Sequence, residues 1–309
     1  MVAILTIIII VFLVMQKSNK TKYFGKIVDY SFGLSAAKAV RKHLLDQDFE
    51  MAEVILEKMS ANDLTQTLDY IGLVIEKPLL MRWLKNNHNK DFPYLALGVY
   101  FIHEAWKIWS HAVAKEVADE QREGFLEFQK KALKAFLSMD KNSLLMPEVN
   151  ARLIRVYMGL GEQTALRECF FSAIESNPDL VWAYLHYCEA IEPKWGGNEI
   201  LIQEMMDLLP DNLLIKQIIE LKIINDSIVF NANFFGGSFE LLIQRAHHAL
   251  VRIDKEISKK EPRSIHRYVL YGYMMTIAEA LKNKEAQKKY MNKVGNYLAL
   301  YPFGIRVAI

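Results

Sequence analysis

Residues 157–178 read YMGLGEQTALRECFFSAIESNP, and this stretch decides the fold class. A tyrosine is followed by a glycine after four positions, and then by phenylalanine, alanine and proline at intervals of nine, three and five. These residues are Tyr157, Gly161, Phe170, Ala173 and Pro178. Such intervals are typical of two packed helices, which we place within residues 147–178.

The same intervals resemble the tetratricopeptide repeat, in which helix pairs stack side by side. Two positions depart from the repeat. The small residue expected four positions before Phe170 is displaced to Ala165, and the one expected three positions before Tyr157 is replaced by Ile154. The packing of the first helix should therefore differ from that of a regular repeat.

Helical periodicity of the apolar residues continues in both directions from this pair. The break at residues 46–48 predicts a turn between two helices, Asn62 or Asp63 is expected to cap the next helix, and Asn283 should divide the last pair. Asn177 and Pro178 predict the cap and first residue of another helix. We therefore expect an all-α fold of tetratricopeptide-like stacked helix pairs, an α–α superhelix over residues 35–309, after an N-terminal apolar helix.

Composition supports this fold class. Of 309 residues, 52% are hydrophobic and only 14 are Gly and 8 Pro, which indicates a globular chain rather than a disordered or all-β one. The two cysteines, Cys169 and Cys188, do not form a disulfide framework, which suits a reducing compartment.

The net charge of +2 hides an uneven distribution. From Glu240 onward there are 13 Lys or Arg against 6 Asp or Glu, whereas the remainder has 25 against 30. A basic end can meet anionic lipid or nucleic acid, but charge runs most often form solvated helix surfaces. Nucleic acid is accordingly not an expected partner.

The first fifteen residues, MVAILTIIIIVFLVM, are almost entirely apolar, and four lysines follow within residues 17–26. As a helix they would span about 22 Å, short of a hydrocarbon core of about 30 Å. No basic residue precedes the run and no small-residue cleavage site follows it, so we predict an uncleaved membrane anchor over residues 1–16. Residues 17–34 would be a juxtamembrane linker, and the lysines place the folded domain in the cytoplasm. A buried N-terminal helix is the alternative.

A further resemblance rests on Leu97-Gly98, Ala105-Trp106, the pair at 157–178, and PKWGG at 193–197. Across residues 40–240 the chain resembles a bacterial family of helical, tetratricopeptide-like proteins known as a domain of unknown function. It departs at Asn198, where that family usually has Ser. The resemblance implies a bacterial protein with a helical-repeat fold, and it brings no catalytic residue. Together with the predicted anchor over residues 1–16, it leads us to expect a single-pass protein of the bacterial inner membrane.

The stretch KWGGN at 194–198 allows two interpretations. Its glycines could present backbone N–H groups to an anion at the start of the next helix. We favour a structural hinge, in which Gly196 and Gly197 adopt positive φ, Trp195 folds back as an apolar plug and Asn198 caps the next helix. Gly236 and Gly237, followed by Ser238, look like a second hinge of the same kind.

No pattern in the chain predicts a metal, a cofactor or a catalytic group. A zinc motif starting at His103 needs a second histidine four positions later, where Lys107 stands. His247 and His248 are adjacent and would point about 100° apart on a helix. We therefore expect no metal ligand, no cofactor and no enzymatic activity.

These observations favour a membrane-tethered helical-repeat module that binds a protein or peptide partner. Aromatic side chains commonly anchor such contacts. The candidates are Tyr94, Tyr100, Trp182, Tyr184 and Tyr187, and each of them could equally be a core residue. Two alternatives stay open: an envelope-associated immunity or accessory protein that neutralises a toxin or secretion component, and an enzyme with an unrecognised site.

Overall fold

The described fold is built almost entirely of helices. A computed structural model describes residues 22–23, 26–86, 91–109, 117–209, 213–229, 238–257, 264–295 and 297–298. Its helices are α2 (Ser35–Leu45), α3 (Phe49–Glu57), α4 (Ala61–Val74), α5 (Lys77–Asn86), α6 (Asp91–Trp109), α7 (Asp119–Leu137), α8 (Met146–Leu160), α9 (Gln163–Ser176), α10 (Val181–Ala190), a 3-10 turn η1 (Pro193–Trp195), α11 (Glu199–Asp207), α12 (Leu213–Val229), α13 (Phe239–Glu256), α14 (Ile265–Ala280) and α15 (Lys284–Val294). The predicted all-α class is confirmed.

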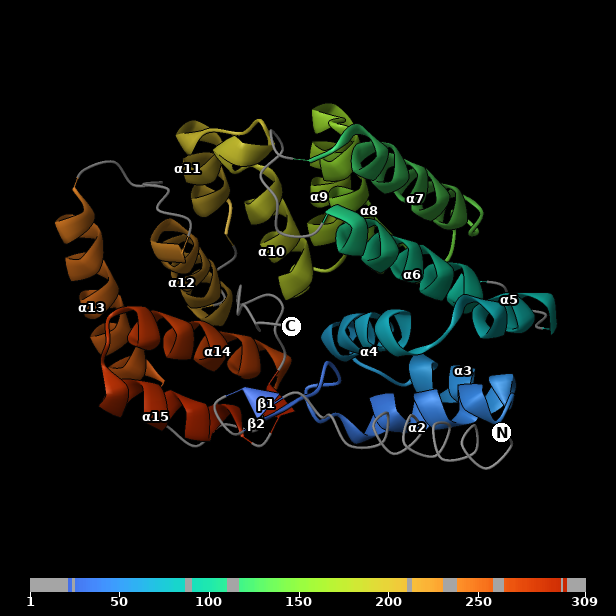
Figure 1. Cartoon of the computed structure of the whole chain (residues 1–309), viewed down its shortest axis with the longest axis horizontal. Coiled ribbons are helices and arrows are strands. Elements are labelled where there is room, and N and C mark those ends of the chain that lie inside the picture. The colour runs from blue at the N-terminus through green and yellow to red at the C-terminus, as the bar shows by residue number, and fades with distance from the viewer. Residues whose placement is uncertain are drawn as a thin grey trace, which may run out of the picture.

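Consecutive helices alternate between two layers. The even-numbered helices from α4 to α14 each pack against the next even-numbered one, and α7, α9, α13 and α15 pack on the helix that precedes them. In Figure 1, α10, α12 and α14 lie nearer the centre of the molecule than α11, α13 and α15. Helices α8 and α9 are the predicted pair at 147–178, and Gly161 joins them with a left-handed φ of 78°.

Helix α8 separates two hydrophobic cores. Its residues Ala151, Ile154 and Met158 belong to a core shared with α10, α12 and α14. Its residues Val149 and Leu153 belong to a second core built from α2 to α7. The two sets occupy different faces because helical residues three or four positions apart share a face.

The N-terminal part of the domain differs from the prediction. Residues 17–34 were expected to be a linker, but Lys22–Tyr23 (β1) and Lys26–Val28 (β2) form an antiparallel hairpin, and β2 pairs in parallel with β3 (Tyr297–Leu298) near the other end of the chain. Phe32 is only 2% exposed, stacks on Tyr268 of α14 with ring centroids 4.0 Å apart, and lies 6.5 Å from Trp182 of α10. Residues 26–32 thus contact β3, α10 and α14, and Figure 1 shows the hairpin between α2 and α14–α15.

Two helix starts were predicted at the wrong residues. Helix α4 is capped by Ser60, whose hydroxyl accepts from the Asp63 N–H, so neither Asn62 nor Asp63 is the cap. Asn62 is buried instead, and its amide donates to the Asp179 carbonyl at 2.9 Å and accepts from the Val181 N–H at 3.0 Å. It therefore links α4 to the start of α10, a partner that its sequence neighbours do not indicate.

Asn177 ends α9 rather than capping α10, which begins only at Val181. Its side chain accepts from the Asp179 N–H and shapes the turn between the two helices. The turn at 46–48 and the break near Asn283 are confirmed. Asp48 caps α3 after the first of these turns, and Asn283 caps α15 after the second.

The predicted anchor over residues 1–16 lies outside the described residues. Within the ranges given above, none of the helices combines the length and the apolar character that crossing a bilayer requires.

Candidate functional site

The segment from Glu192 to Asn198 is a fixed turn between α10 and α11. Gly196 has a φ of 90°, as predicted for a helix end. Gly197 does not lie in the left-handed region; its backbone passes so close to Ile191 that an added Cβ would lie 1.8 Å from the Ile191 carbonyl oxygen. Positive φ was therefore the wrong reason for Gly197. The Asn198 side chain accepts from the Leu201 N–H and caps α11, as predicted.

Backbone hydrogen bonds already occupy the N–H groups of this turn. The N–H groups of Trp195 and Gly197 both donate to the Glu192 carbonyl, at 2.9 Å and 3.1 Å, and that of Gly196 donates to Pro193. These donors are therefore not available for an anion, which argues against the alternative interpretation of KWGGN.

A buried ion-pair cluster holds the turn in place. The Glu192 carboxylate lies 3.0 Å from the Lys222 ammonium and 2.7 Å from that of Lys194, and Lys222 also pairs with Asp226. Burial raises the pKa of Glu192, with the nearby Asp226 adding to the effect and the two lysines opposing it. Burial alone would lower the pKa of Lys222, but Asp226 and Glu192 raise it well above its ordinary value. The cluster therefore supports a structural role for the turn.

Trp195 packs against the C-terminal end of α6. Its ring centroid lies 5.4 Å from that of Trp106 and 5.9 Å from that of Trp109, and the Gln163 side chain donates to its carbonyl at 2.9 Å. All three indoles are half-buried, which agrees with the predicted plug. Gly236 and Gly237 lie outside the described residues, although Ser238 does cap α13 by accepting from the Leu241 N–H.

The two glycines of the turn should respond differently to alanine. We expect Gly197→Ala to lower the free energy of unfolding by about 1–3 kcal/mol, because the methyl group must displace the backbone at Ile191. Gly196→Ala has open space and should cost only about 1 kcal/mol for the left-handed conformation. Thermal and chemical denaturation of both variants would compare them, and a larger loss at Gly196 would contradict this account.

Three of the five predicted binding aromatics are not on the surface. Trp182, Tyr184 and Tyr187 are buried in the core around α10, where Tyr187 stacks on Phe170 at 3.9 Å. Helix α10 is buried on nearly every side, so its aromatic residues serve packing. Tyr94 and Tyr100 of α6 are half-exposed and are not brought together with the other three.

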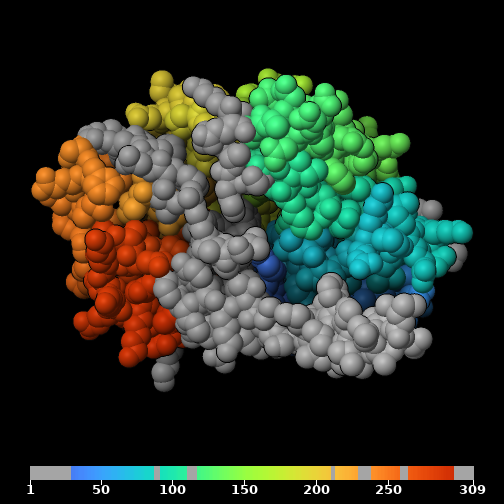
Figure 2. Space-filling view, viewed as in Figure 1, coloured from blue at the N-terminus to red at the C-terminus, as the bar shows by residue number. Residues whose placement is uncertain are grey.

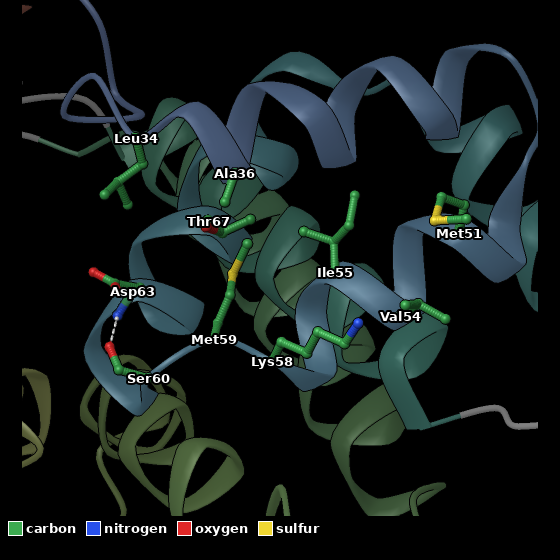
Figure 3. Close-up of a pocket in the computed structure, with 10 residues that line it drawn as sticks. All are labelled: Leu34, Ala36, Met51, Val54, Ile55, Lys58, Met59, Ser60, Asp63 and Thr67. Atoms are coloured by element: carbon green, nitrogen blue, oxygen red, sulfur yellow. Dashed lines mark hydrogen bonds between the residues drawn. The ribbon is translucent and has the colours of Figure 1, made fainter.

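An apolar cavity opens between α2, α3 and α4. Its volume is about 350 Å³. Figure 3 shows its lining, in which Met59 extends from the end of α3 toward Thr67 of α4. The lining residues are Leu34, Ala36, Met51, Val54, Ile55, Lys58, Met59, Ser60, Asp63 and Thr67. We call this cavity the α2–α4 pocket.

The chain builds the pocket with a second apolar stripe on α3. Phe49, Ala52 and Leu56 face the core, whereas Met51 and Ile55, four residues apart, form a separate stripe that Met59 continues. Met51 is 43% exposed. The sequence carried this signal, but apolar residues at helical spacing most often indicate core, and the stripe was not singled out.

One polar atom beneath the pocket lining lacks a partner. The Thr67 side chain is fully buried, and its hydroxyl oxygen has no hydrogen-bond partner in the part of the chain that the structure describes. A buried hydroxyl without a partner is costly, and this oxygen is also closed off from the open space of the pocket. Lys58 and Asp63 place opposite charges on the pocket lining.

A second buried polar cluster joins α4, α6 and α8. The Arg152 guanidinium donates to Asp69 at 2.6 Å, to Glu148 at 2.8 Å and to the Thr65 carbonyl at 2.7 Å. The His103 Nε2 atom lies 3.1 Å from Asp69 Oδ1, so the residue that would begin a zinc motif has a carboxylate partner. Burial alone would raise the pKa of Asp69, but Arg152 and His103 hold it well below its ordinary value. Burial raises the pKa of Glu148, and Arg152 opposes that shift.

This cluster has the character of a structural network rather than a catalytic one. Thr65 donates to Glu148, and the guanidinium bonds to both carboxylates from inside the helix layer. Among the described residues no group of three or more His, Cys, Asp or Glu side chains is arranged to hold a metal ion. Cys169 and Cys188 are free thiols, and burial raises the pKa of Cys188 to about 12, which makes it a poor nucleophile.

Comparison with known proteins adds no further information. No family model, no curated protein and no solved structure matches the chain. The resemblance to a helical family of unknown function therefore stays a prediction.

Proposed function

We propose that this protein is a membrane-tethered, tetratricopeptide-like module that binds an amphipathic helix of a partner protein in the α2–α4 pocket, without catalysis. The observation that carries the proposal is the open apolar pocket, lined by Met51, Ile55 and Met59. Stacked helix pairs commonly serve recognition, and the alternating layers of α4 to α14 are consistent with such a stack.

The chemistry of the pocket favours a helical peptide as the occupant. Its volume is at the small end of the ligand-site range of about 300–1,000 Å³, enough for a few side chains rather than for a large cofactor. Met51 and Met59 are flexible and polarisable, so they adapt to different apolar side chains. Lys58 and Asp63 can pair with an acidic and a basic residue that flank the apolar face of a helix.

The tether would hold this pocket at the cytoplasmic side of a bacterial inner membrane. Residues 1–16 supply the apolar segment, and the lysines that follow favour retention of the domain in the cytoplasm. A tethered module meets membrane-bound partners at a raised effective concentration, so a modest pocket suffices for binding.

A charged residue in the pocket should weaken peptide binding. The probe is a fluorescent amphipathic peptide with leucines at i, i+3, i+4 and i+7 and flanking Glu and Lys residues, and a scrambled peptide without this period serves as its control. We expect Met59→Glu to weaken the anisotropy-measured affinity by at least about tenfold, because peptide binding would then bury a charge against the apolar side chains of the peptide.

The matched control for this substitution is Met81→Glu. Met81 lies on α5, outside the pocket, and is 45% exposed, close to the value for Met51. It should change the affinity by less than about twofold. Met51→Glu provides a second pocket variant at an exposed position that tolerates charge. Equal affinity for the scrambled peptide, or equal losses at positions 59 and 81, would reject the proposal.

A further inference from the structure

The exposed side of α15 is strongly basic. Tyr290 and Val294 bury one side of the helix against the core. The other side carries four exposed lysines and one exposed glutamate. These residues are Lys284, Glu285, Lys288, Lys289 and Lys293, and Lys289 pairs with Asp254 of α13. We call this side the α15 lysine face; the red surface at the lower left of Figure 2 belongs to α14 and α15.

The sheet places this helix near the point where the apolar segment joins the domain. Only Gly295 and residue 296 separate α15 from β3, and β3 pairs with β2, which in turn pairs with β1. Between the apolar residues 1–15 and the start of β1 at Lys22 there are six residues. Fully extended, this stretch reaches about 24 Å.

A bilayer that holds residues 1–16 therefore lies within about 24 Å of β1, which the sheet connects to the C-terminal end of α15. Surface charges act on one another over about 8 Å at physiological ionic strength, so proximity decides whether the lysines feel the lipid. Each lysine near an anionic leaflet contributes about 1 kcal/mol, or roughly a fivefold gain in binding.

We propose that the α15 lysine face contacts anionic lipid headgroups of the same bilayer that holds the N-terminal segment. The inference rests on the proposed tether. A single anchor would leave the domain free to rotate at the surface, whereas a second, electrostatic contact fixes which face of the helical body meets the lipid. The basic excess of the C-terminal region then has a defined ligand rather than bulk water.

Amine labelling of the full chain tests this contact. The protein is reconstituted into nanodiscs of phosphatidylcholine alone and of phosphatidylcholine with about one third phosphatidylserine, and labelled lysines are quantified by mass spectrometry. We expect Lys284, Lys288 and Lys293 to react several-fold more slowly in the anionic discs, and 0.5 M salt to remove the difference. The matched controls are Lys130, Lys134 and Lys141, which are exposed on and after α7 and should label equally in both discs.

A charge-removal variant supplies the second measurement. K284Q/K288Q/K293Q should float with anionic vesicles at least about tenfold less than the unchanged chain, relative to neutral vesicles, whereas K130Q/K134Q/K141Q should not. Equal labelling in the two discs, or equal effects of the two triple variants, would overturn the inference. Selective loss of duplex DNA binding by the α15 variant, with lipid binding unchanged, would also overturn it in favour of a nucleic-acid surface.

Failure of the tether is distinguishable from failure of the lysine face. A chain that does not enter neutral discs lacks the proposed anchor. In that case the α15 variant still tests the lysine face. Flotation of the unanchored chain with anionic vesicles should be lost in K284Q/K288Q/K293Q, and unchanged flotation would overturn the inference.

Discussion

Replacing Arg152 with methionine should lower the free energy of unfolding by about 3–5 kcal/mol, because the change leaves Asp69 and Glu148 buried without their cation. Arg152 is 1% exposed and bonds to α4 and α8 together, so its loss affects the contact between two helices of the inner layer. Chemical denaturation of the purified chain would measure the loss.

The stability of the Arg152→Met variant should also depend on pH. In the native cluster Arg152 keeps the pKa of Asp69 low, so that interaction stabilises the fold above the unfolded value and is lost as the pH falls through the folded value. Without Arg152, both carboxylates should have folded pKa values above their unfolded ones, which makes the variant relatively more stable in acid. We expect its deficit to shrink between pH 7 and pH 5.

Two controls separate this explanation from general damage. Lys131→Met removes a surface ion pair with Glu127 and should leave the midpoint of chemical denaturation nearly unchanged. Adding Asp69→Leu and Glu148→Leu to Arg152→Met removes the stranded carboxylates and should recover much of the loss. A deficit that is independent of pH and is not recovered in the triple variant would show that Arg152 acts through its volume alone.

Phe32→Ala should also cost about 3–5 kcal/mol, as expected for removing a buried aromatic ring. The ring lies against Tyr268 and Trp182, far from it in the sequence, and is 2% exposed. Position 32 has a positive φ of 51°, which costs a similar free energy with alanine as with phenylalanine. The difference in the free energy of unfolding between the unchanged chain and the variant therefore reports the loss of the ring.

The loss of protection from hydrogen exchange should be confined to the helices around Phe32. Hydrogen exchange in α10 and α14 should accelerate in Phe32→Ala, while α5 and α7, which belong to the other core, should change little. Leu45→Ala, at a side chain that is 49% exposed, is the matched control and should cost less than about 1 kcal/mol. If Phe32→Ala behaved like this control, residues 29–34 would be the linker that the sequence suggested.

Features set by near neighbours in the chain were predictable. The turn at 46–48, the pair α8–α9 and the cap at Asn198 depend on residues within a few positions of one another. Phe32 and Asn62 could not be assigned in this way. Their partners lie more than a hundred positions away in the sequence, so the residues next to Phe32 and Asn62 do not indicate these contacts.

The candidate site was less predictable for a related reason. The aromatics of α10 look like binding anchors until the helix is seen to be buried on nearly all sides. The α2–α4 pocket depends on how far α2 stands from α3 and α4, a distance that apolar periodicity does not give. Gly197 was correctly singled out, yet its role follows from the approach of Ile191, which the Gly-Gly pattern does not reveal.

The methyl resonances of Met51 and Met59 offer the most direct test of the pocket as a peptide site. The full chain, labelled at methionine methyl groups and held in nanodiscs, is titrated with the amphipathic probe peptide. We predict saturable shifts at Met51 and Met59 and an unchanged signal from Met81 on α5. Shifts of equal size at all three methionines, or none at Met51 and Met59 up to millimolar peptide, would contradict the account.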